Sequence, residues 1–431
     1  MVEQHEKTLV PQIRFAGFTD PWEQRKLGEV AHFINGRAYS QNELLSSGKY
    51  PVLRVGNFYT NDSWYYSNLE LEDKNYAYEG DLLYTWSATF GPHIWHGNKV
   101  IYHYHIWKVQ LEAALEKLFA FQLLERDKER ILSDKNGSTM VHITKTGIEN
   151  TSVLMPCSVE EQRRIGAFFD RLDSLITLHQ RKYDKLCVLK KSMLDKMFPK
   201  GGSLYPEIRF AGFTDPWEQR KLGEELGFLR NNTLSRAELS DSEGTVFDIH
   251  YGDVLIKYGS VLDAEKADVP RIANDAVANR QTCDCLQDGD VIIADTAEDS
   301  AVGKCTELCN SAGKKVFSGL HTMPLRPMRK YASGYLGHYL NSPAFHDQLL
   351  PLMQGIKVIS VSRSAIEDMT MSVPSVAEQA SIGAFFDRLD SLITLHQRKY
   401  CGVASWMLGV ALVRLGSESD GAFGEMKHVL Q

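Results

Sequence analysis

Long apolar runs, dense cysteine and a basic excess are all missing from this sequence of 431 residues. No stretch of about 18 apolar residues is present, so no membrane-spanning helix is predicted. The first residues, MVEQHEKTLVPQ, lack the apolar core of a signal peptide, and we therefore expect the protein in the cytoplasm. Seven cysteines in so long a chain indicate reduced thiols rather than a disulfide framework.

The formal charge of −7, from 48 Lys+Arg against 55 Asp+Glu, excludes an indiscriminate polyanion binder, because such proteins carry a basic excess. The charge is unevenly distributed. Residues 160–200 carry ten Lys+Arg against six Asp+Glu, whereas residues 225–374 carry fourteen against twenty. Selective reading of a nucleic acid within a larger complex therefore stays open. The length and the 43% hydrophobic content predict two to three folded domains.

Motifs of common enzyme classes are absent too. The sequence contains no G-x-x-x-x-G-K-[ST], G-x-G-x-x-G, H-E-x-x-H or G-x-S-x-G pattern, and no Asn-Pro-Pro-Tyr loop for holding a flipped base. Two candidate metal sites fail on spacing. Cys283, Cys285, Cys305 and Cys309 lack the Cys-x2-Cys spacing of a zinc knuckle, and His93, His96, His103 and His105 have no carboxylate or cysteine at ligand spacing. We expect no metal site and interpret these histidines as sheet-surface or core residues.

Two long segments occur twice without any change. The N-terminal repeat, IRFAGFTDPWEQRKLGE, occupies Ile13–Glu29 and Ile208–Glu224; the C-terminal repeat, GAFFDRLDSLITLHQRKY, occupies Gly166–Tyr183 and Gly383–Tyr400. The interiors between these repeats differ but share landmarks, such as GDLLYTWSATFG from Gly80 and GDVIIADTAEDSAVG from Gly289. Identical flanks around unlike interiors indicate one scaffold that displays two recognition surfaces. Duplication without divided function, the alternative, would leave the interiors as alike as the ends.

A long helix is predicted from about Glu160 to Phe198, because apolar residues recur there every seven positions. The second copy carries the same stripe, so the two helices can form an intramolecular antiparallel coiled coil. Two amphipathic helices packed on separate globular cores are the alternative. The predicted seam consists of Ile165, Phe168, Leu172, Leu175, Leu186, Leu189, Ile382, Phe385, Leu389 and Leu392.

The interiors have an α+β pattern with a sheet bias. We predict strands at Tyr50–Phe58, Asp81–Trp86 and Lys99–Val109, and helical segments at Leu111–Leu132 and Tyr335–Met353. Gly201–Ser203 is the predicted hinge between the halves.

Fourteen aromatic residues between Phe58 and Trp107 are interleaved with basic and amide side chains, a pattern that can contact bases and sugars. The alternative is that these aromatics build a β core, and the polar residues in or beside turns are therefore the better candidates. In the first interior the DNA-binding candidates are Arg37, Tyr39, Arg54, Asn57, Thr85, Trp86 and Ser87. In the second they are Tyr251, Lys257, Tyr258, Lys304, Lys314, Lys315, His321 and Arg326.

Several segments follow one another in the order typical of one family: IRFAGFTDPWEQRKLGE, EEQRRIGAFFDRLDSLITLHQRKYDKLCVLKKSMLDKMFPK, IHYGDVLIKYG, GDVIIADTAEDSAVGK and GLHTMPLRP. The chain resembles, over nearly its whole length, the specificity subunit of type I restriction-modification systems. The resemblance implies an α+β pseudo-twofold repeat with two target recognition domains that each read half of a bipartite DNA site. The domains would be separated by two conserved helices, whose antiparallel coiled coil sets the spacing and docks two modification subunits.

The resemblance also assigns the chemistry to other subunits. Adenine methylation with S-adenosylmethionine would belong to the modification subunits and ATP- and Mg-dependent cleavage to the restriction subunits, so this chain would be non-catalytic and bind no cofactor. The implied domains are residues 1–158 and 204–375, with helices at 159–203 and 376–431. After Tyr400 the sequence CGVASWMLGVALVRLG lacks the lysine residues of the segment DKLCVLKKSMLDKMFPK that follows Tyr183. This difference puts docking of the second modification subunit in question. A coiled-coil assembly scaffold that never touches DNA is the alternative function, and a self-contained nuclease or methyltransferase is disfavoured.

Overall fold

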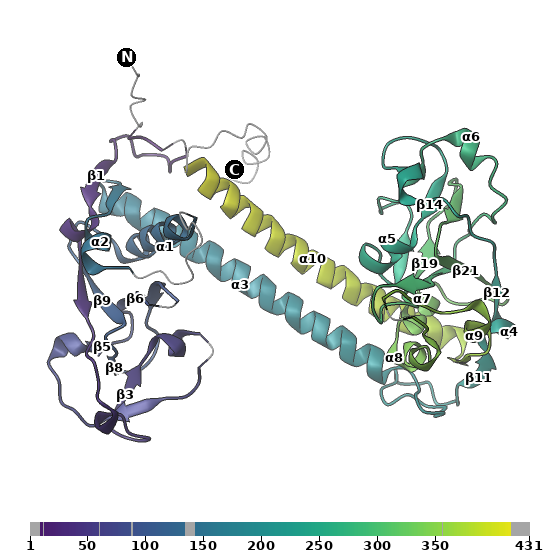
Figure 1. Ribbon diagram of the computed structural model, residues 1–431, viewed down its shortest axis with the longest axis horizontal. Coiled ribbons are helices and arrows are strands. Elements are labelled where there is room, and N and C mark those ends of the chain that lie inside the picture. The colour runs from purple at the N-terminus through teal and green to yellow at the C-terminus, as the bar shows by residue number, and fades with distance from the viewer. Residues whose placement is uncertain are drawn as a thin grey trace, which may run out of the picture. The chain divides into compact units, whose positions relative to one another are not determined.

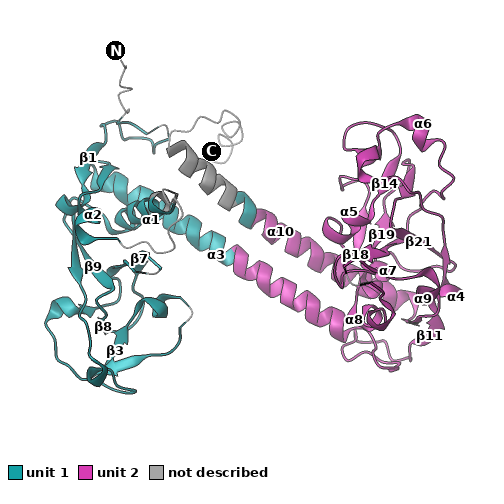
Figure 2. Ribbon diagram, viewed as in Figure 1, with its two compact units in different colours: residues 1–178, 400–431 teal, residues 179–399 magenta. Residues whose placement is uncertain are grey.

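The computed structural model describes residues 9–11, 13–59, 61–87, 89–133, 143–355 and 357–414; the side chains of residues 129, 130, 133 and 403–414 are not described. The chain divides into two compact units, residues 1–178 with 400–431 (unit 1) and residues 179–399 (unit 2) (Figure 2). The domain boundaries and the hinge expected from the sequence stay a prediction. In the described part of the chain, no helix is long and apolar enough to cross a membrane.

The described residues of unit 1 form two four-stranded sheets, ordered β2-β9-β6-β7 and β4-β3-β8-β5, and a ribbon of β1 and β10 (Figure 1). The strands are β1 (Glu23–Lys26), β2 (Ala31–Asn35), β3 (Tyr50–Leu53), β4 (Tyr65–Ser67), β5 (Tyr76–Ala77), β6 (Leu82–Thr85), β7 (Gly91–Ile94), β8 (Val100–Tyr102), β9 (Ile106–Leu111) and β10 (Ser152–Met155). The helices are α1 (Lys117–Ser133), α2 (Lys145–Glu149) and α3 (Val159–Lys196), which continues into unit 2. The main core joins Phe33 and Tyr84 of the first sheet to Phe119 of α1 and Ile165 of α3.

The described residues of unit 2 repeat this plan with a five-stranded sheet, ordered β12-β21-β17-β19-β15, and a four-stranded sheet, ordered β13-β16-β14-β20. The strands are β11 (Glu218–Lys221), β12 (Leu226–Phe228), β13 (Leu239–Ser240), β14 (Phe247–Ile249), β15 (Val261–Asp263), β16 (Arg271–Ile272), β17 (Val291–Ala294), β18 (Thr296–Ala297), β19 (Cys305–Cys309), β20 (Val316–Ser318), β21 (Thr322–Pro327), β22 (Ile359–Ser360) and β23 (Thr370–Val373). The helices are α4 (Leu222–Glu225), α5 (Tyr251–Ile256), α6 (Asp275–Ala278), α7 (Tyr335–Leu340), α8 (Pro343–His346), α9 (Arg363–Glu367) and α10 (Val376–Arg414).

The repeated residues make the same contacts in both units. Arg14 forms a two-bond ion pair with Glu161 at 2.6 and 2.7 Å, and Arg209 pairs in the same way with Glu378 at 2.7 and 2.8 Å. The strand of the N-terminal repeat pairs antiparallel with the strand before the long helix, β1 with β10 and β11 with β23. We call this shared set of contacts the frame.

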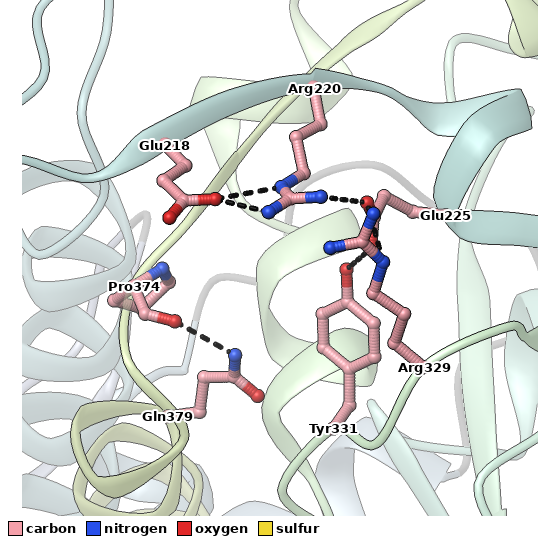
Figure 3. Close-up of polar contacts among 7 residues, drawn as sticks. All are labelled: Glu218, Arg220, Glu225, Arg329, Tyr331, Pro374 and Gln379. Carbon is pink, nitrogen blue, oxygen red and sulfur yellow. Dashed lines mark hydrogen bonds and ion pairs between the residues drawn. The ribbon is translucent and has the colours of Figure 1, made fainter.

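Unit 2 adds a buried polar group to the frame. The Glu225 carboxylate accepts hydrogen bonds from Arg220 Nη1 at 2.9 Å and from the Tyr331 hydroxyl at 2.8 Å (Figure 3). Arg329 lies 3.5 Å from the same carboxylate. The repeat offset of 195 residues puts Val30, also buried, at this place in unit 1. The two frames are therefore alike in backbone pairing but differ in the polarity of one buried position.

The two long helices are antiparallel where they meet within unit 2. Lys190 of α3 forms an ion pair with Asp390 of α10 at 2.5 Å. Further along, His179 Nδ1 lies 2.9 Å from His396 Nδ1, and these histidines occupy the same position of the C-terminal repeat. A lower residue number in α3 is paired with a higher residue number in α10, so the predicted antiparallel pairing is confirmed for these segments.

The predicted seam residues divide between domain cores and the helix surface. Ile165, Phe168 and Leu172 pack into the main core of unit 1, whereas Leu186, Ile382, Phe385 and Leu389 pack into the main core of unit 2. Leu175, Leu189 and Leu392 are 36–40% exposed. The stripe therefore packs into a domain core at Ile165 to Leu172, and in unit 2 residues of both long helices join one core.

Several predicted elements are shorter or broken in the structure. The predicted strand Tyr50–Phe58 ends at Leu53, because a 3-10 turn follows at Val55–Phe58, and Lys99–Val109 is two strands separated by a turn. The predicted helix Tyr335–Met353 is interrupted at Ser342–Pro343 and splits into α7 and α8. The tail keeps its helix to Arg414 despite Gly402 and Gly409, but the side chains that would continue the seam there lie outside the described residues.

Candidate nucleic-acid interface

A three-residue turn occupies the same place in each unit: His103–His105 between β8 and β9, and Gly319–His321 between β20 and β21. The first residue of each turn donates its backbone N–H to a parallel neighbouring strand, His103 to Leu53 O at 2.9 Å and Gly319 to Ile249 O at 3.0 Å. The carbonyl oxygen of the last residue accepts from the residue after the central strand. Trp86 N donates to His105 O at 3.2 Å, and Asp295 N donates to His321 O at 3.1 Å.

Two more loops reach each turn at equivalent positions. Arg37 N donates to Tyr102 O at 3.2 Å, and Asn232 N donates to Ser318 O at 2.8 Å. The segments RVGNF (residues 54–58) and HYGDV (residues 250–254) both follow the strand that pairs with β8 or β20. Each unit therefore brings three loops to one turn.

Aromatic and basic side chains surround the turn of unit 1. Trp86 packs against Tyr104 and His105, with ring centroids 6.2 and 5.0 Å apart, and its indole N–H donates to Tyr104 O at 2.9 Å. Tyr39 stacks on His103 at 6.5 Å, and the Arg37 guanidinium lies 5.1 Å from the Tyr39 ring. The structure thus brings the candidates Arg37, Tyr39 and Trp86 together at one turn.

Arg54 joins this cluster. Its guanidinium lies 4.3 Å from the Tyr65 ring and donates to Ser63 O at 3.1 Å. Burial, together with the nearby His105 and Arg54, lowers the pKa of His103 to about 4. The imidazole of His103 is therefore neutral at pH 7 and offers one donor and one acceptor nitrogen. Tyr104 and Tyr65 remain 39% and 37% exposed, so the turn presents an aromatic surface to solvent.

The other candidates of unit 1 have structural contacts. The Asn57 carboxamide accepts from Arg54 N at 3.0 Å and donates to Asn61 O and Ser63 O, so it holds the 54–63 loop. Thr85 is fully buried in β6, where its hydroxyl lies 3.3 Å from Gly91 O. The prediction that Thr85 projects from a turn is wrong, because the strand continues through it. Ser87 is half-buried beside Trp86 in the chain.

The turn of unit 2 carries different chemistry on the same plan. His321 Nδ1 lies 3.4 Å from both Asp295 Oδ1 and the Thr296 hydroxyl, and its ring centroid is 5.3 Å from that of Tyr251. The Thr296 hydroxyl also donates to Asp295 Oδ1 at 2.7 Å. The candidates Tyr251 and His321 are therefore brought together, with carboxylate and hydroxyl groups in place of the indole of unit 1.

The remaining candidates of unit 2 do not share this turn. Lys315 precedes β20 and Arg326 stands near the far end of β21, so a strand separates each from His321. Arg326 forms two hydrogen bonds to the buried Asp290, at 2.9 and 2.6 Å. The ammonium groups of Lys257, Lys304 and Lys314 donate to the backbone carbonyls of Asp268, Leu255 and Ala264, and Tyr258 is buried.

Sequence reasoning missed the turn residues His103, Tyr104 and His105, and also Asp295. A signal was available in the sequence, because each turn ends in a histidine and directly follows an equivalent strand, β8 or β20. In the described residues no group of three or more His, Cys, Asp or Glu side chains is arranged to hold a metal ion.

Residues 19–187 match the family model described as "Type I restriction modification DNA specificity domain". That range covers the interior of unit 1, its turn and most of α3, and the repeats carry the same frame into unit 2. Residues 19–187 therefore carry a DNA specificity domain of type I restriction-modification systems.

Similar proteins span nearly the whole length of the chain. The type I restriction enzyme MjaVIII specificity subunit of Methanocaldococcus jannaschii is 21% identical over 400 residues, which cover 88% of each chain. The crystal structure of the S subunit from M. genitalium has a TM-score of 0.55 at 14% identity and covers 95% of this chain and 100% of that chain. The HsdS subunit from Thermoanaerobacter tengcongensis has a TM-score of 0.41 at 15% identity, over 92% and 97% of the two chains. The likeness to the M. genitalium structure shows an α+β fold with two domains. The family match gives residues 19–187 a domain for recognition of DNA sequence.

Proposed function

We propose that each unit of this specificity subunit reads one half of a bipartite, gapped site in double-stranded DNA. The observation that carries the proposal is the equivalence of the two turns. The same backbone hydrogen bonds hold His103–His105 in unit 1 and Gly319–His321 in unit 2, while the side chains around them differ. Two copies of one backbone arrangement that carry different side chains are suited to read two different short DNA sequences.

The side chains at each turn are of types that contact DNA in other proteins. Imidazole, hydroxyl and carboxylate groups donate to or accept from base edges, and carboxylates accept from the amino group of cytosine. Arginine and aromatic side chains contact phosphates, sugars and bases. Under this proposal, unit 1 uses the aromatic and basic cluster of Arg54, Trp86 and Tyr104, whereas unit 2 uses Tyr251, Asp295 and His321.

The chemistry would be performed by other subunits. Two modification subunits would methylate adenine with S-adenosylmethionine, and restriction subunits would cleave DNA with ATP and Mg. This chain would contribute no catalytic group and bind none of these cofactors. The acidic composition is compatible with that role, because a selective reader within a complex needs less basic charge than a non-specific binder.

Methylome sequencing of cells that carry the complete system tests the proposal. We expect adenine methylation at one gapped motif with two specified halves. A continuous, ungapped motif would contradict the assignment of one half to each unit. If the chain were only a coiled-coil scaffold, affinity for DNA would not depend on its turn residues, and the salt dependence expected of phosphate contacts would be unchanged by their substitution.

Paired substitutions assign the halves. His105→Ala should weaken selection of one half-site about tenfold and His321→Ala the other, because one good base contact is worth about 1–3 kcal/mol. Lys330→Ala is the matched control, since Lys330 is exposed and follows the far end of β21 from His321. A loss at the same half-site with both histidine variants would refute the assignment.

A further inference from the structure

A buried carboxyl group lies directly beneath the turn of unit 2. Asp248 of β14 is fully buried, and its Oδ2 accepts from Asn232 Nδ2 at 2.5 Å. Its Oδ1 has no hydrogen-bond partner among the described residues. Burial raises the pKa of Asp248 to about 6, outweighing the hydrogen bond from Asn232, which lowers it. Buried polar groups with an unused acceptor are costly, so this carboxyl group calls for an explanation other than stability.

The carboxyl group occupies the space that a side chain at the first turn position would need. A Cβ atom added at Gly319 would lie 2.3 Å from Asp248 Oδ1 and 3.2 Å from its Cγ. Gly319 O also accepts from Asn231 Nδ2 at 3.0 Å and from the Thr322 hydroxyl at 2.5 Å. Two hydrogen bonds thus hold the start of the turn, and Asp248 leaves no room for a side chain there.

The end of the turn has a strained backbone. His321 has a φ of +57°, and among the described non-glycine residues only Asn310 shares a positive φ. A left-handed conformation is costly for a residue with a side chain and persists where surrounding contacts impose it. The contacts beneath Gly319 and the bond from Asp295 N to His321 O supply that constraint.

Unit 1 has the opposite arrangement at the same place. The strand registers pair Val52 with Ile101 and Asp248 with Phe317, each one residue before the strand residue whose carbonyl receives the turn N–H. Val52 is therefore the counterpart of Asp248, and His103 is the counterpart of Gly319. An apolar residue beneath the turn accompanies a large turn side chain in unit 1, and a carboxyl group accompanies glycine in unit 2.

We propose that Asp248 is a positioning residue for DNA recognition by unit 2: its carboxyl group holds the Gly319–His321 turn so that His321 faces the half-site. The inference rests on the proposed function and adds a residue that does not itself touch DNA. It also implies that exposed turn residues cannot be exchanged between the units without the residue beneath them.

The test uses the full chain assembled with its modification subunits and a double-stranded DNA library of randomised sequence. Selection from the library measures preference at each half-site separately, so the half-site read by unit 1 is an internal reference. Asp248→Ala should lower preference at the half-site of unit 2 about tenfold or more, with the other half unchanged. Asp248→Asn keeps the shape of the side chain and should retain preference within about threefold.

A second pair of variants probes the contact without removing the carboxyl group. Gly319→Ala should lose preference at the half-site of unit 2, because its Cβ meets Asp248. The double variant Gly319→Ala with Asp248→Ala should regain part of it. Gly259→Ala is the matched control, since a Cβ there meets nothing closer than Val261 O at 4.0 Å.

Four outcomes decide between these possibilities. Wild-type preference in folded Asp248→Ala would overturn the positioning role, as would equal losses in Gly319→Ala and the double variant. If Asp248→Ala does not fold, the glycine variants alone decide, and unchanged preference in Gly319→Ala overturns the role. A wild-type complex without preference at either half-site would instead refute the proposed function, and the positioning role with it.

Discussion

Unit 1 and unit 2 share the contacts of the frame, yet the turns that the two frames support have different side chains. Arg14 with Glu161 and Arg209 with Glu378 make the same two-bond ion pair to within 0.1 Å. Around the turns, indole and tyrosine rings in unit 1 are replaced by carboxylate and hydroxyl groups in unit 2. The difference teaches that backbone hydrogen bonds, rather than side-chain identity, define the position of the turn in each unit.

The largest expected effect comes from creating a cavity at the same position of the frame in each unit. Leu27 and Leu222 occupy the same position of the N-terminal repeat and are both buried. Leu27→Ala and Leu222→Ala should each reduce the free energy of unfolding of their own unit by about 3 kcal/mol. Urea unfolding followed by hydrogen exchange resolves the two units. Leu189→Ala, at a 40% exposed position, is the control and should cost less than about 1 kcal/mol.

The comparison would break if these two costs differed by more than about 2 kcal/mol, because the cavity term in Leu→Ala series varies by about that much between unlike sites. Such a result would mean that the same residue contributes unequally to the free energy of unfolding of the two units.

The buried Glu225 sharpens the comparison, because unit 1 has Val30 there. Glu225→Val removes the acceptor for Arg220 and Tyr331 and should destabilise unit 2 by about 2 kcal/mol, the cost of leaving buried donors unpaired. Thermal and urea unfolding measure the effect. The exposed neighbour Glu224→Gln is the control. A stabilised Glu225→Val variant would show that the apolar solution of unit 1 serves equally well in unit 2.

The two units should also respond to acid in opposite ways at one group each. Burial lowers the pKa of His93 in unit 1 to about 4, so the unfolded chain binds more protons below pH 6.5 and stability falls as the pH drops towards 4. Burial raises the pKa of Asp248 to about 6, so the folded chain binds more protons between pH 4 and 6 and stability falls as the pH rises through that window. Arg236 and Asp253 face Asp248 with opposite effects on its pKa.

Substitutions isolate these two contributions. Asp248→Asn should gain stability relative to the wild type by about 1.5 kcal/mol on going from pH 4 to pH 7, and His93→Gln should gain by a similar amount on going from pH 7 to pH 4. Unfolding by urea at a series of pH values measures both differences. Parallel curves for variant and wild type in either case would contradict the corresponding assignment.

The smallest effect concerns the loop that carries Arg54. Asn57→Ala removes three hydrogen bonds to the backbone of the 54–63 loop and should cost about 1 kcal/mol in unit 1. It should also weaken DNA binding through loss of the Arg54 position. Unchanged stability with altered half-site preference would instead favour direct base contact by Asn57, as the sequence alone predicts.

The sequence predicted the repeats, the long helix and the central strand well, and the turns poorly. The α3 bounds, Val159–Lys196, lie within two residues of the predicted helix because capping and periodicity are local signals. The turn at His103–His105 contains no glycine or proline, so a run of apolar and aromatic residues concealed it within one predicted strand. Only hydrogen bonds to the distant Leu53 and Trp86 reveal it.

The candidate site residues show the same division between local and distant information. The heptad count found the apolar stripe of α3 but could not distinguish a partner helix from the core that Ile165 joins. The position of Lys304 beside a turn likewise could not show that its ammonium group donates to Leu255 O, a contact between residues far apart in the sequence. The assignment of each candidate to DNA contact stays a prediction.

The bond between His179 and His396 has a consequence for the symmetry of the molecule. These imidazoles occupy the same position of one repeated sequence and meet through the same atom, Nδ1 to Nδ1 at 2.9 Å. A hydrogen bond between two like nitrogens requires a proton on one and a lone pair on the other. One of these two identical residues therefore carries a proton on Nδ1 and the other does not, so the repeats differ here even where their sequences are the same.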